Sequence, residues 1–272
     1  MSQPQTWFIF PGLEAFRSLS FKSLLRFDQF LANCNEFRAR FGIDLLSVIK
    51  EDCLQTSHAF AILTTFQISA VETLAKLGVV PDGYIGRSVG EIACAYLDKC
   101  FDRWQSILLS YTLGKALDEG RGLLGMMAIV HVDPTRFESI KNNDVYITGY
   151  DSIDCITVSG LQSSMKKLIM RLNDEAIEVE PINSFGNALH SPEVNYLWEY
   201  AKENLYKIIS NVGVRSERWV STVCEDKSEL FHLLCPRYLV KNLTSPVYFM
   251  EAAKSIPQNA TIIEINAIIE SS

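Results

Sequence analysis

A serine between two glycines is the first residue of this chain that could do chemistry. The segment Gly86-Arg-Ser-Val-Gly90 places Ser88 after the short apolar run Tyr84-Ile85 and before a helical pattern. A serine on such a sharp strand-to-helix turn holds its hydroxyl out of the sheet, where nearby backbone N–H groups face the charge that develops during attack on a carbonyl. Glycines flank the serine because a Cβ would crowd the turn. The alternative is a glycine-rich connection without chemistry.

A serine hydroxyl needs a base before it can attack a carbonyl. The chain has four histidines, at positions 58, 131, 190 and 232. His131 lies in an alternating strand pattern, His58 at a helix start and His232 in an apolar stretch, which favours structural roles for all three. His190 follows the small-residue loop Asn183–Asn187 and precedes a predicted helix, and loops at such junctions carry functional side chains. We therefore predict His190 as the base, with a buried structural histidine as the alternative.

Composition excludes several classes of function. The net charge is −7, which argues against a nucleic-acid partner. Seven scattered cysteines without a C-x-x-C pair predict reduced thiols and no zinc site, so we expect no metal. No apolar run reaches the roughly 18 residues of a membrane span, and the first residues lack the apolar core of a signal peptide. We expect a cytoplasmic protein without a membrane partner.

Hydrophobic periodicity predicts an α/β chain in which a second unit is inserted. Between residues 126 and 182 the patterns follow the order β-α-β-β-α-β, the ferredoxin-like arrangement. Before and after this unit, strands alternate with longer helical patterns. The predicted strands of the larger unit are 7–10, 84–85, 219–222 and 261–265, and its predicted helices are 21–41, 59–77, 103–117 and 192–209.

Five segments, in the same order along the chain, resemble motifs of acyl-CoA:acyl-carrier-protein acyltransferase domains. The elbow Gly86–Glu91 resembles their G-H-S-[LV]-G-E, and Asn187–Ser191 resembles the segment ending in A-F-H-S. Thr157–Gly160 matches T-[VI]-S-G, Trp219–Thr222 matches W-x-S-T, and Tyr238–Phe249 matches Y-x-x-x-N-L-x-S-P-V-x-F. The chain is most similar to the malonyl/acetyl transferase domain of animal-type fatty acid synthases, with polyketide synthase acyltransferases next.

The resemblance implies a fold and a mechanism. The fold is an α/β-hydrolase-like subdomain, residues 1–125 and 183–272, with the ferredoxin-like subdomain 126–182 inserted. Ser88 would take an acyl group of the malonyl/acetyl class from coenzyme A with His190 as base, and would pass it to the phosphopantetheine thiol of an acyl carrier protein. The backbone N–H groups of Val89 and Leu13 would bind the oxyanion. No cofactor would stay bound, since the coenzyme A thioester is a substrate, and further domains of a fatty acid synthase-type multienzyme would be partners.

Four departures from the family pattern fall at the expected active site. Arg87 replaces the histidine before the nucleophile, Phe16 the glutamine of the first loop, and Ile268 the histidine of E-I-x-P-H. Leu113 stands where the family has the arginine that pairs with the malonyl carboxylate. Because an unpaired buried charge is costly, we expect neutral acyl groups such as acetyl to be preferred, unless Arg87 supplies the cation. Leu113, Arg87 and Asn187 are thus the residues expected at the substrate.

Two alternatives to an active acyltransferase stay open. The four departures favour a catalytically weakened domain that serves as a structural or docking module of a multienzyme, whereas the presence of both Ser88 and His190 favours activity. A serine hydrolase or thioesterase ranks third, because it shares the chemistry of the elbow but not the other four motifs.

Overall fold

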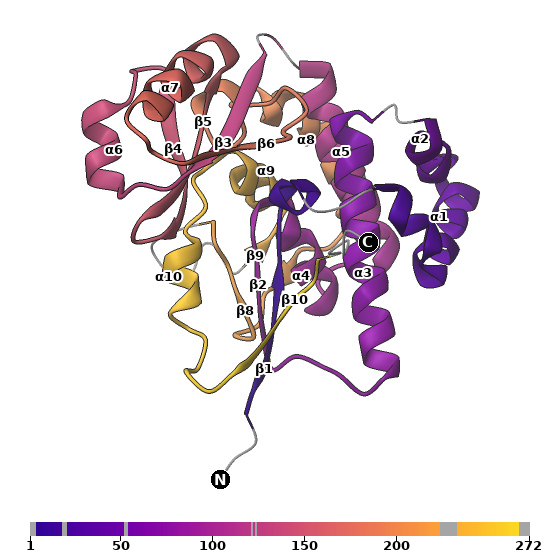
Figure 1. Ribbon diagram of the computed structural model, residues 1–272. Coiled ribbons are helices and arrows are strands. Elements are labelled where there is room, and N and C mark those ends of the chain that lie inside the picture. Colours follow the sequence, from indigo (N-terminus) through magenta and orange to yellow (C-terminus); the bar gives the residue numbers. More distant parts are fainter. Residues whose placement is uncertain are drawn as a thin grey trace.

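The computed structural model describes residues 4–17, 21–51, 54–120, 122, 124–223 and 233–266. Its larger part is built on a four-stranded parallel sheet of order β10-β1-β2-β8 (Figure 1). The strands are β1 (Thr6–Phe10), β2 (Gly83–Gly86), β8 (Trp219–Val220) and β10 (Thr261–Glu264). The central strand β1 reads as a nearly continuous apolar run because a parallel strand is covered on both faces.

Two long helices cover one side of the parallel sheet. Helix α3 (Thr56–Lys76) packs against α5 (Arg103–Gly120), and a Cβ at Gly114 would come within 2.5 Å of the Ser57 backbone. The first N–H groups of α3 are bound by the Asp118 carboxylate, which lies 3.1 Å from the Thr56 nitrogen and 2.9 Å from the Ser57 nitrogen. A side chain from the neighbouring helix therefore caps α3.

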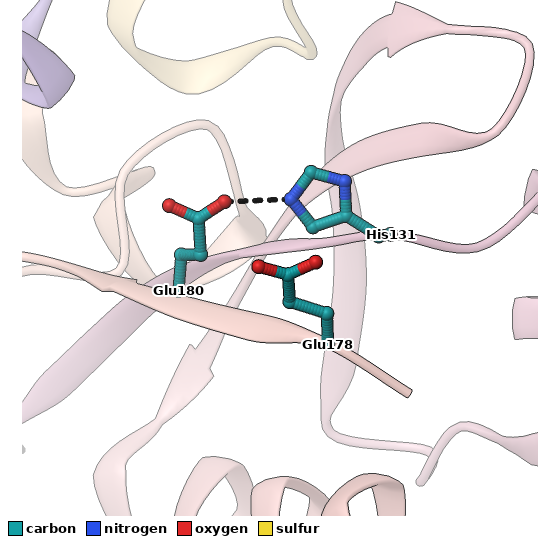
Figure 2. A group of neighbouring side chains, drawn as sticks. All are labelled: His131, Glu178 and Glu180. Carbon is teal, nitrogen blue, oxygen red and sulfur yellow. Dashed lines mark hydrogen bonds and ion pairs between the residues drawn. The ribbon is translucent and has the colours of Figure 1, made fainter. Parts of the chain in front are cut away.

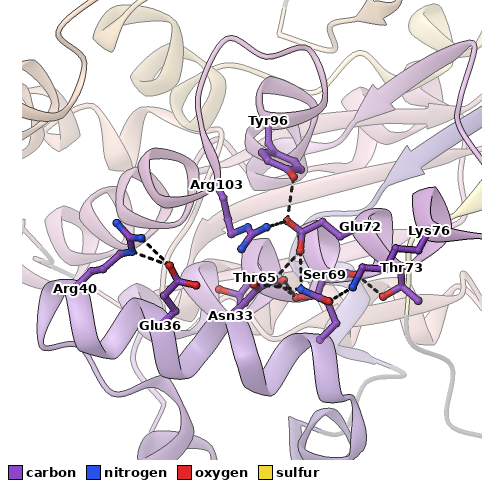
Figure 3. Close-up of polar contacts among 11 residues, drawn as sticks. Asn33, Glu36, Arg40, Thr65, Ser69, Glu72, Thr73, Lys76, Tyr96 and Arg103 are labelled. Carbon is purple, nitrogen blue, oxygen red and sulfur yellow. Dashed lines mark hydrogen bonds and ion pairs between the residues drawn. The ribbon is translucent and has the colours of Figure 1, made fainter.

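The predicted helix 21–41 is interrupted. The chain forms a 3-10 turn η2 (Phe21–Arg26) and then α1 (Asp28–Phe41), with Phe27 extended between them and edge-on to Phe66 of α3 at 6.3 Å. Helix α2 (Leu45–Glu51) packs Leu45 and Ile49 into an apolar cluster with Phe66 of α3. A network of polar contacts fixes α1 beside the long helices. Figure 3 shows the centre of this network, where Glu72 of α3 accepts from Asn33 at 3.1 Å and pairs with Arg103 at 2.5 Å.

The second sheet is antiparallel, with the order β4-β5-β3-β6. Its strands are β3 (Gly125–Val130), β4 (Val145–Ser152), β5 (Cys155–Leu161) and β6 (Val179–Ile182), and α6 (Pro134–Ile140) and α7 (Gln162–Asp174) cover one face (Figure 1). Asp133 caps α6 through a 2.9 Å bond from the Arg136 N–H, with Pro134 at the first helical position. The strand order is that of a ferredoxin-like unit, and the α/β fold predicted from the sequence is confirmed.

The remaining elements return to the larger part. They are η4 (Pro192–Val194), α8 (Leu197–Ile208), a two-stranded ribbon of β7 (Gly213–Val214) and β9 (Leu233–Leu234), α9 (Pro236–Thr244) and α10 (Phe249–Ala253). The predicted helix 192–209 is thus divided into η4 and α8. None of the helices in the described part of the chain has the length and apolar character needed to cross a membrane.

A buried carboxylate ties the helix after β2 to two distant segments. Glu91 opens α4 (Glu91–Leu97), is 1% exposed and accepts from the Thr222 N–H at 2.6 Å, the Thr222 hydroxyl at 2.9 Å and the Tyr238 hydroxyl. Burial raises the pKa of Glu91, and these donors oppose that effect. The contacts hold α9 and the segment that follows β8 against α4, so Glu91 connects the segments that surround the end of β2.

We predict that Glu91→Ala destabilises the protein by about 3 kcal/mol or more, because it leaves several buried donors without an acceptor. Denaturant unfolding measures the change in free energy. Glu251→Ala is the matched control: it removes a carboxylate that is 44% exposed and pairs with Lys254, and should cost less than about 1 kcal/mol. Equal losses in the two variants would contradict the structural role of Glu91.

Candidate active site

Ser88 occupies a strained backbone conformation at the carboxyl end of β2. Its φ is 55°, and it begins the 3-10 turn η3 (Ser88–Gly90) that leads into α4. A Cβ on Gly86 would lie 2.5 Å from the Glu91 nitrogen, and one on Gly90 would lie 2.3 Å from the Phe10 carbonyl oxygen. Both glycines are therefore required by close backbone approach, and the strain at Ser88 is of the kind that active sites retain.

His190 faces the serine. Its Nε2 lies 2.8 Å from the Ser88 hydroxyl, and its Nδ1 lies 2.8 Å from the backbone carbonyl of Ser245. Because a carbonyl oxygen can only accept, Nδ1 carries the proton and Nε2 is the acceptor that faces the hydroxyl. His190 has a positive φ of 61°, and its backbone N–H donates to the Leu243 carbonyl at 2.8 Å. The tautomer needed for a general base is thus fixed by the carbonyl of Ser245, directly after α9.

The electrostatic surroundings keep His190 neutral. Its side chain is buried, and burial lowers its pKa to about 4, against the opposing effect of its bond to Ser245. A neutral imidazole at physiological pH can take the proton of the serine hydroxyl. Between pH 6.5 and about 4, His190 is protonated in the unfolded chain but neutral in the folded chain. The free energy of unfolding contributed by this histidine therefore falls as the pH drops through that range.

Two backbone N–H groups beside the serine lack intrahelical acceptors. Val89 follows the serine in η3, and Leu13 begins the 3-10 turn η1 (Leu13–Arg17), where the first N–H groups have no acceptor within the turn itself. The loop before η1 lies against the elbow, since a Cβ on Gly12 would be 3.1 Å from the Ser88 Cβ. Both residues predicted for the oxyanion hole therefore lie on the turns next to the nucleophile.

A small cavity opens above Ser88 and His190, between the two sheets. Its volume is about 20 Å³, which is room for little more than one water molecule. The lining is mainly apolar, with one charged pair. It consists of Leu13, Glu14, Arg87, Ser88, Met127, Thr148, Gly149, Thr157, Ile182, Leu189, His190 and Val247.

Arg87 reaches this cavity, but its charge is already matched. Its Nε lies 3.2 Å from the Glu14 carboxylate, and its terminal nitrogen contacts Asp151 of β4. The guanidinium also covers the Phe249 ring at 5.0 Å. Burial raises the pKa of Asp151, an effect that Arg87 opposes. Arg87 therefore joins the two subdomains within an ion cluster that carries more negative than positive groups.

Two residues expected at the substrate lie elsewhere. Leu113 is fully buried in the hydrophobic core of the larger part, and the Asn187 amide donates to the Thr56 hydroxyl at 2.9 Å and to the Ser184 carbonyl at 3.0 Å. Neither belongs to the described lining of the cavity above Ser88. An apolar side chain packs into the core where a cation could not, and the hydrogen bonds of Asn187 turn its amide toward α3. Arg87 alone of the three reaches the cavity.

Several residues of the site were missed by sequence reasoning. The Asn242 amide donates to the Ser88 carbonyl at 2.7 Å, and the Ser245 carbonyl orients His190. Both lie within the motif Tyr238–Phe249, which signalled the segment without assigning roles. Asp151 had no sequence signal, because its partner Arg87 is 64 residues away.

Four further residues singled out in the sequence lie away from Ser88 or outside the described residues. Phe16 packs on Phe21 at 4.5 Å between ring centroids and on Phe185 at 6.2 Å. His58 is half-buried, with its ring edge-on to Tyr111. His232 and Ile268 lie outside the described residues.

A separate cluster of possible metal ligands lies on the antiparallel sheet. Figure 2 shows His131 beside Glu178 and Glu180, with its Nε2 2.6 Å from a Glu180 oxygen. The ligand atoms lie within 4.8 Å of one another, and His131 and Glu178 are exposed. Exposed acidic groups of this kind commonly occur without a metal, so the cluster by itself does not indicate a metal site.

The fold and the site define a class of protein, namely α/β proteins in which a serine on a strand-to-helix elbow faces a histidine. The family model "Acyl transferase domain" matches residues 17–267. A highly reducing polyketide synthase of Gibberella zeae is 30% identical over 212 residues, which cover 73% of this chain and 8% of that synthase. The chain therefore belongs to the acyl transferase domain family, of the type found in polyketide and fatty acid synthases.

Solved structures share the fold. The acyltransferase domain of the polyketide synthase PpsC of Mycobacterium tuberculosis has a TM-score of 0.79 at 21% identity, over 98% of this chain and 86% of that one. A malonyl-transacylase in complex with a type II polyketide synthase acyl-carrier protein has a TM-score of 0.76 at 17% identity, over 96% and 89%. The chain spans 8% of the length of the first curated relatives that it matches.

We predict that His190 titrates with a midpoint near pH 4, because burial opposes its charged form. The measurement is the pH dependence of the His190 ring proton shifts by NMR, with His190→Gln used to assign the signal. A midpoint near the ordinary value of 6.5 would contradict the buried, carbonyl-bonded geometry.

Proposed function

We propose that this chain transfers an acyl group from coenzyme A to the phosphopantetheine thiol of an acyl carrier protein through an acyl-serine at Ser88. The observation that carries the proposal is the 2.8 Å contact between the Ser88 hydroxyl and Nε2 of His190, together with the bond from His190 Nδ1 to the Ser245 carbonyl. These contacts give a nucleophile, a base and a group that orients the base.

In the first half-reaction the Ser88 oxygen attacks the thioester carbonyl while Nε2 of His190 takes its proton. The tetrahedral oxyanion accepts hydrogen bonds from the N–H groups of Leu13 and Val89. Collapse breaks the carbon–sulfur bond, and the imidazolium returns the proton to the departing coenzyme A sulfur.

The second half-reaction reverses these roles. The carrier-protein thiol gives its proton to His190 while its sulfur attacks the acyl carbon. The serine oxygen leaves with the returned proton, which restores the free enzyme. This exchange leaves no group on the protein, so coenzyme A and the carrier protein act in turn at one site.

The comparisons support the partners without identifying them. One solved neighbour is a malonyl-transacylase bound to an acyl-carrier protein, and the curated relatives are long polyketide synthases of which this chain spans 8%. We infer that a carrier protein and other domains of a synthase-type multienzyme are the partners. The cysteines at positions 34, 94, 100 and 235 form no disulfide within the described part of the chain, which supports a reducing, cytoplasmic setting.

The two alternatives differ from this proposal in what happens at Ser88. A structural or docking module would form no acyl-serine, whereas a serine hydrolase would form one and lose it to water. The preserved hydrogen bond between Ser88 and His190 disfavours the first. Geometry at the serine does not separate the second from transfer, so the acceptor must be tested.

We predict that brief incubation with an acyl-CoA adds one acyl group, detected by intact-protein mass, and that Ser88→Ala abolishes the adduct. His190→Gln should slow acylation about 10²- to 10⁴-fold, the range for loss of a general base. Ser191→Ala is the neighbouring hydroxyl control and should label normally, because its hydroxyl bonds to the Ala188 carbonyl and not to His190.

Addition of a phosphopantetheinylated carrier protein should discharge the adduct faster than buffer alone. Discharge at the same rate without the carrier would instead indicate a hydrolase. A folded protein that forms no adduct with acetyl-, malonyl- or longer acyl-CoA would indicate a non-catalytic module.

A further inference from the structure

The Arg87 guanidinium, beside the cavity above Ser88, is held between two carboxylates. The Glu14 and Asp151 side chains are 19% and 11% exposed, and both pair with Arg87, which is 19% exposed. The three residues come from η1, β4 and the elbow. Two of them, Glu14 and Arg87, line the cavity directly above Ser88.

Each carboxylate is held in place by a second donor. Glu14 accepts from the Gly12 N–H at 2.9 Å, and Asp151 accepts from the Thr157 hydroxyl at 2.7 Å. The Phe249 ring covers the guanidinium. Arg87 therefore cannot turn toward a substrate without abandoning contacts that its surroundings fix.

Charge balance then determines what the cavity accepts. Arg87 contributes one positive charge, whereas Glu14 and Asp151 contribute two negative charges when ionised. Even if Asp151 is protonated, Glu14 alone balances Arg87. A carboxylate on the acyl group would add a like charge at a partly desolvated site, where such a juxtaposition is strongly unfavourable.

We infer that Glu14, Arg87 and Asp151 form a specificity device that rejects carboxylated acyl groups, so that Ser88 receives a short, uncharged acyl group such as acetyl. This inference rests on the proposed function. The apolar lining residues Leu13, Met127 and Leu189 suit the same substrate class. Glu14 and Asp151 act as specificity-determining residues by occupying the cation that a malonyl carboxylate would need.

The test is to release Arg87 from its carboxylates. Glu14→Gln keeps an acceptor for the Gly12 N–H, and Asp151→Asn keeps one for the Thr157 hydroxyl, so both variants remove charge with little change in shape. The wild type should acylate Ser88 faster from acetyl-CoA than from malonyl-CoA. The double variant should raise the malonyl-to-acetyl rate ratio about tenfold or more, and each single variant less.

Two further variants assign the effect to the cluster. Asp154→Asn removes an exposed carboxylate from the same hairpin and should leave the ratio unchanged. Arg87→Gln in the double-variant background should abolish the gain, because it removes the released cation.

Binding provides a readout that does not depend on turnover. In Ser88→Ala protein, the ratio of the dissociation constants for malonyl-CoA and acetyl-CoA should fall about tenfold when the two carboxylates are neutralised. Equal wild-type labelling by both acyl-CoAs, or no change of either ratio in the double variant, would overturn the inference while leaving acyl transfer intact. Absence of any Ser88 adduct would instead contradict the proposed function, and the binding ratio would still decide on the cluster. If the double variant fails to fold, Asp151→Asn alone carries the test.

Discussion

The site depends on the left-handed backbone of Ser88. A residue with a side chain adopts this conformation only where its surroundings impose it, and here the surroundings are backbone atoms packed at contact distance on both sides. Gly86 and Gly90 permit that approach. Glu91, directly after the turn, anchors the following helix to α9 and to the segment after β8, so one short segment fixes both the nucleophile and the elements around it.

Helix α9 organises the other half of the site. The Leu243 carbonyl in its last turn binds the backbone N–H of His190, the Ser245 carbonyl directly after it binds Nδ1, and the Asn242 amide donates to the Ser88 carbonyl. The carboxyl end of a helix carries partial negative charge, which suits the donor that faces it. Ser88 and His190 are therefore both held by contacts to α9, although they are 102 residues apart in sequence.

Much of the fold and part of the site were accessible from the sequence. The strand-to-helix elbow and the β-α-β-β-α-β order follow from local hydrophobic periodicity and turn chemistry. These two signals correctly predict which of these segments are strands and which are helices. The partners of Arg87 could not be predicted, because Glu14 and Asp151 approach it only when η1 and β4 close over the elbow. The surroundings of Leu113 and Asn187 were inaccessible for the same reason: a motif position gives a residue's neighbours in the chain, whereas its contacts in the fold depend on tertiary packing.

The group that orients His190 is a main-chain carbonyl, and this shapes how the site responds to sequence change. No substitution at Ser245 deletes that oxygen, so every side chain compatible with the backbone there preserves the acceptor. The orientation of His190 is instead sensitive to substitution of residues that set the backbone path, such as Leu243 and Pro246. Leu243 is buried in the core, and Pro246 restricts Ser245 to extended geometry. The orientation of His190 thus depends on the backbone conformation at Ser245, and a change of side chain at Ser245 leaves it intact.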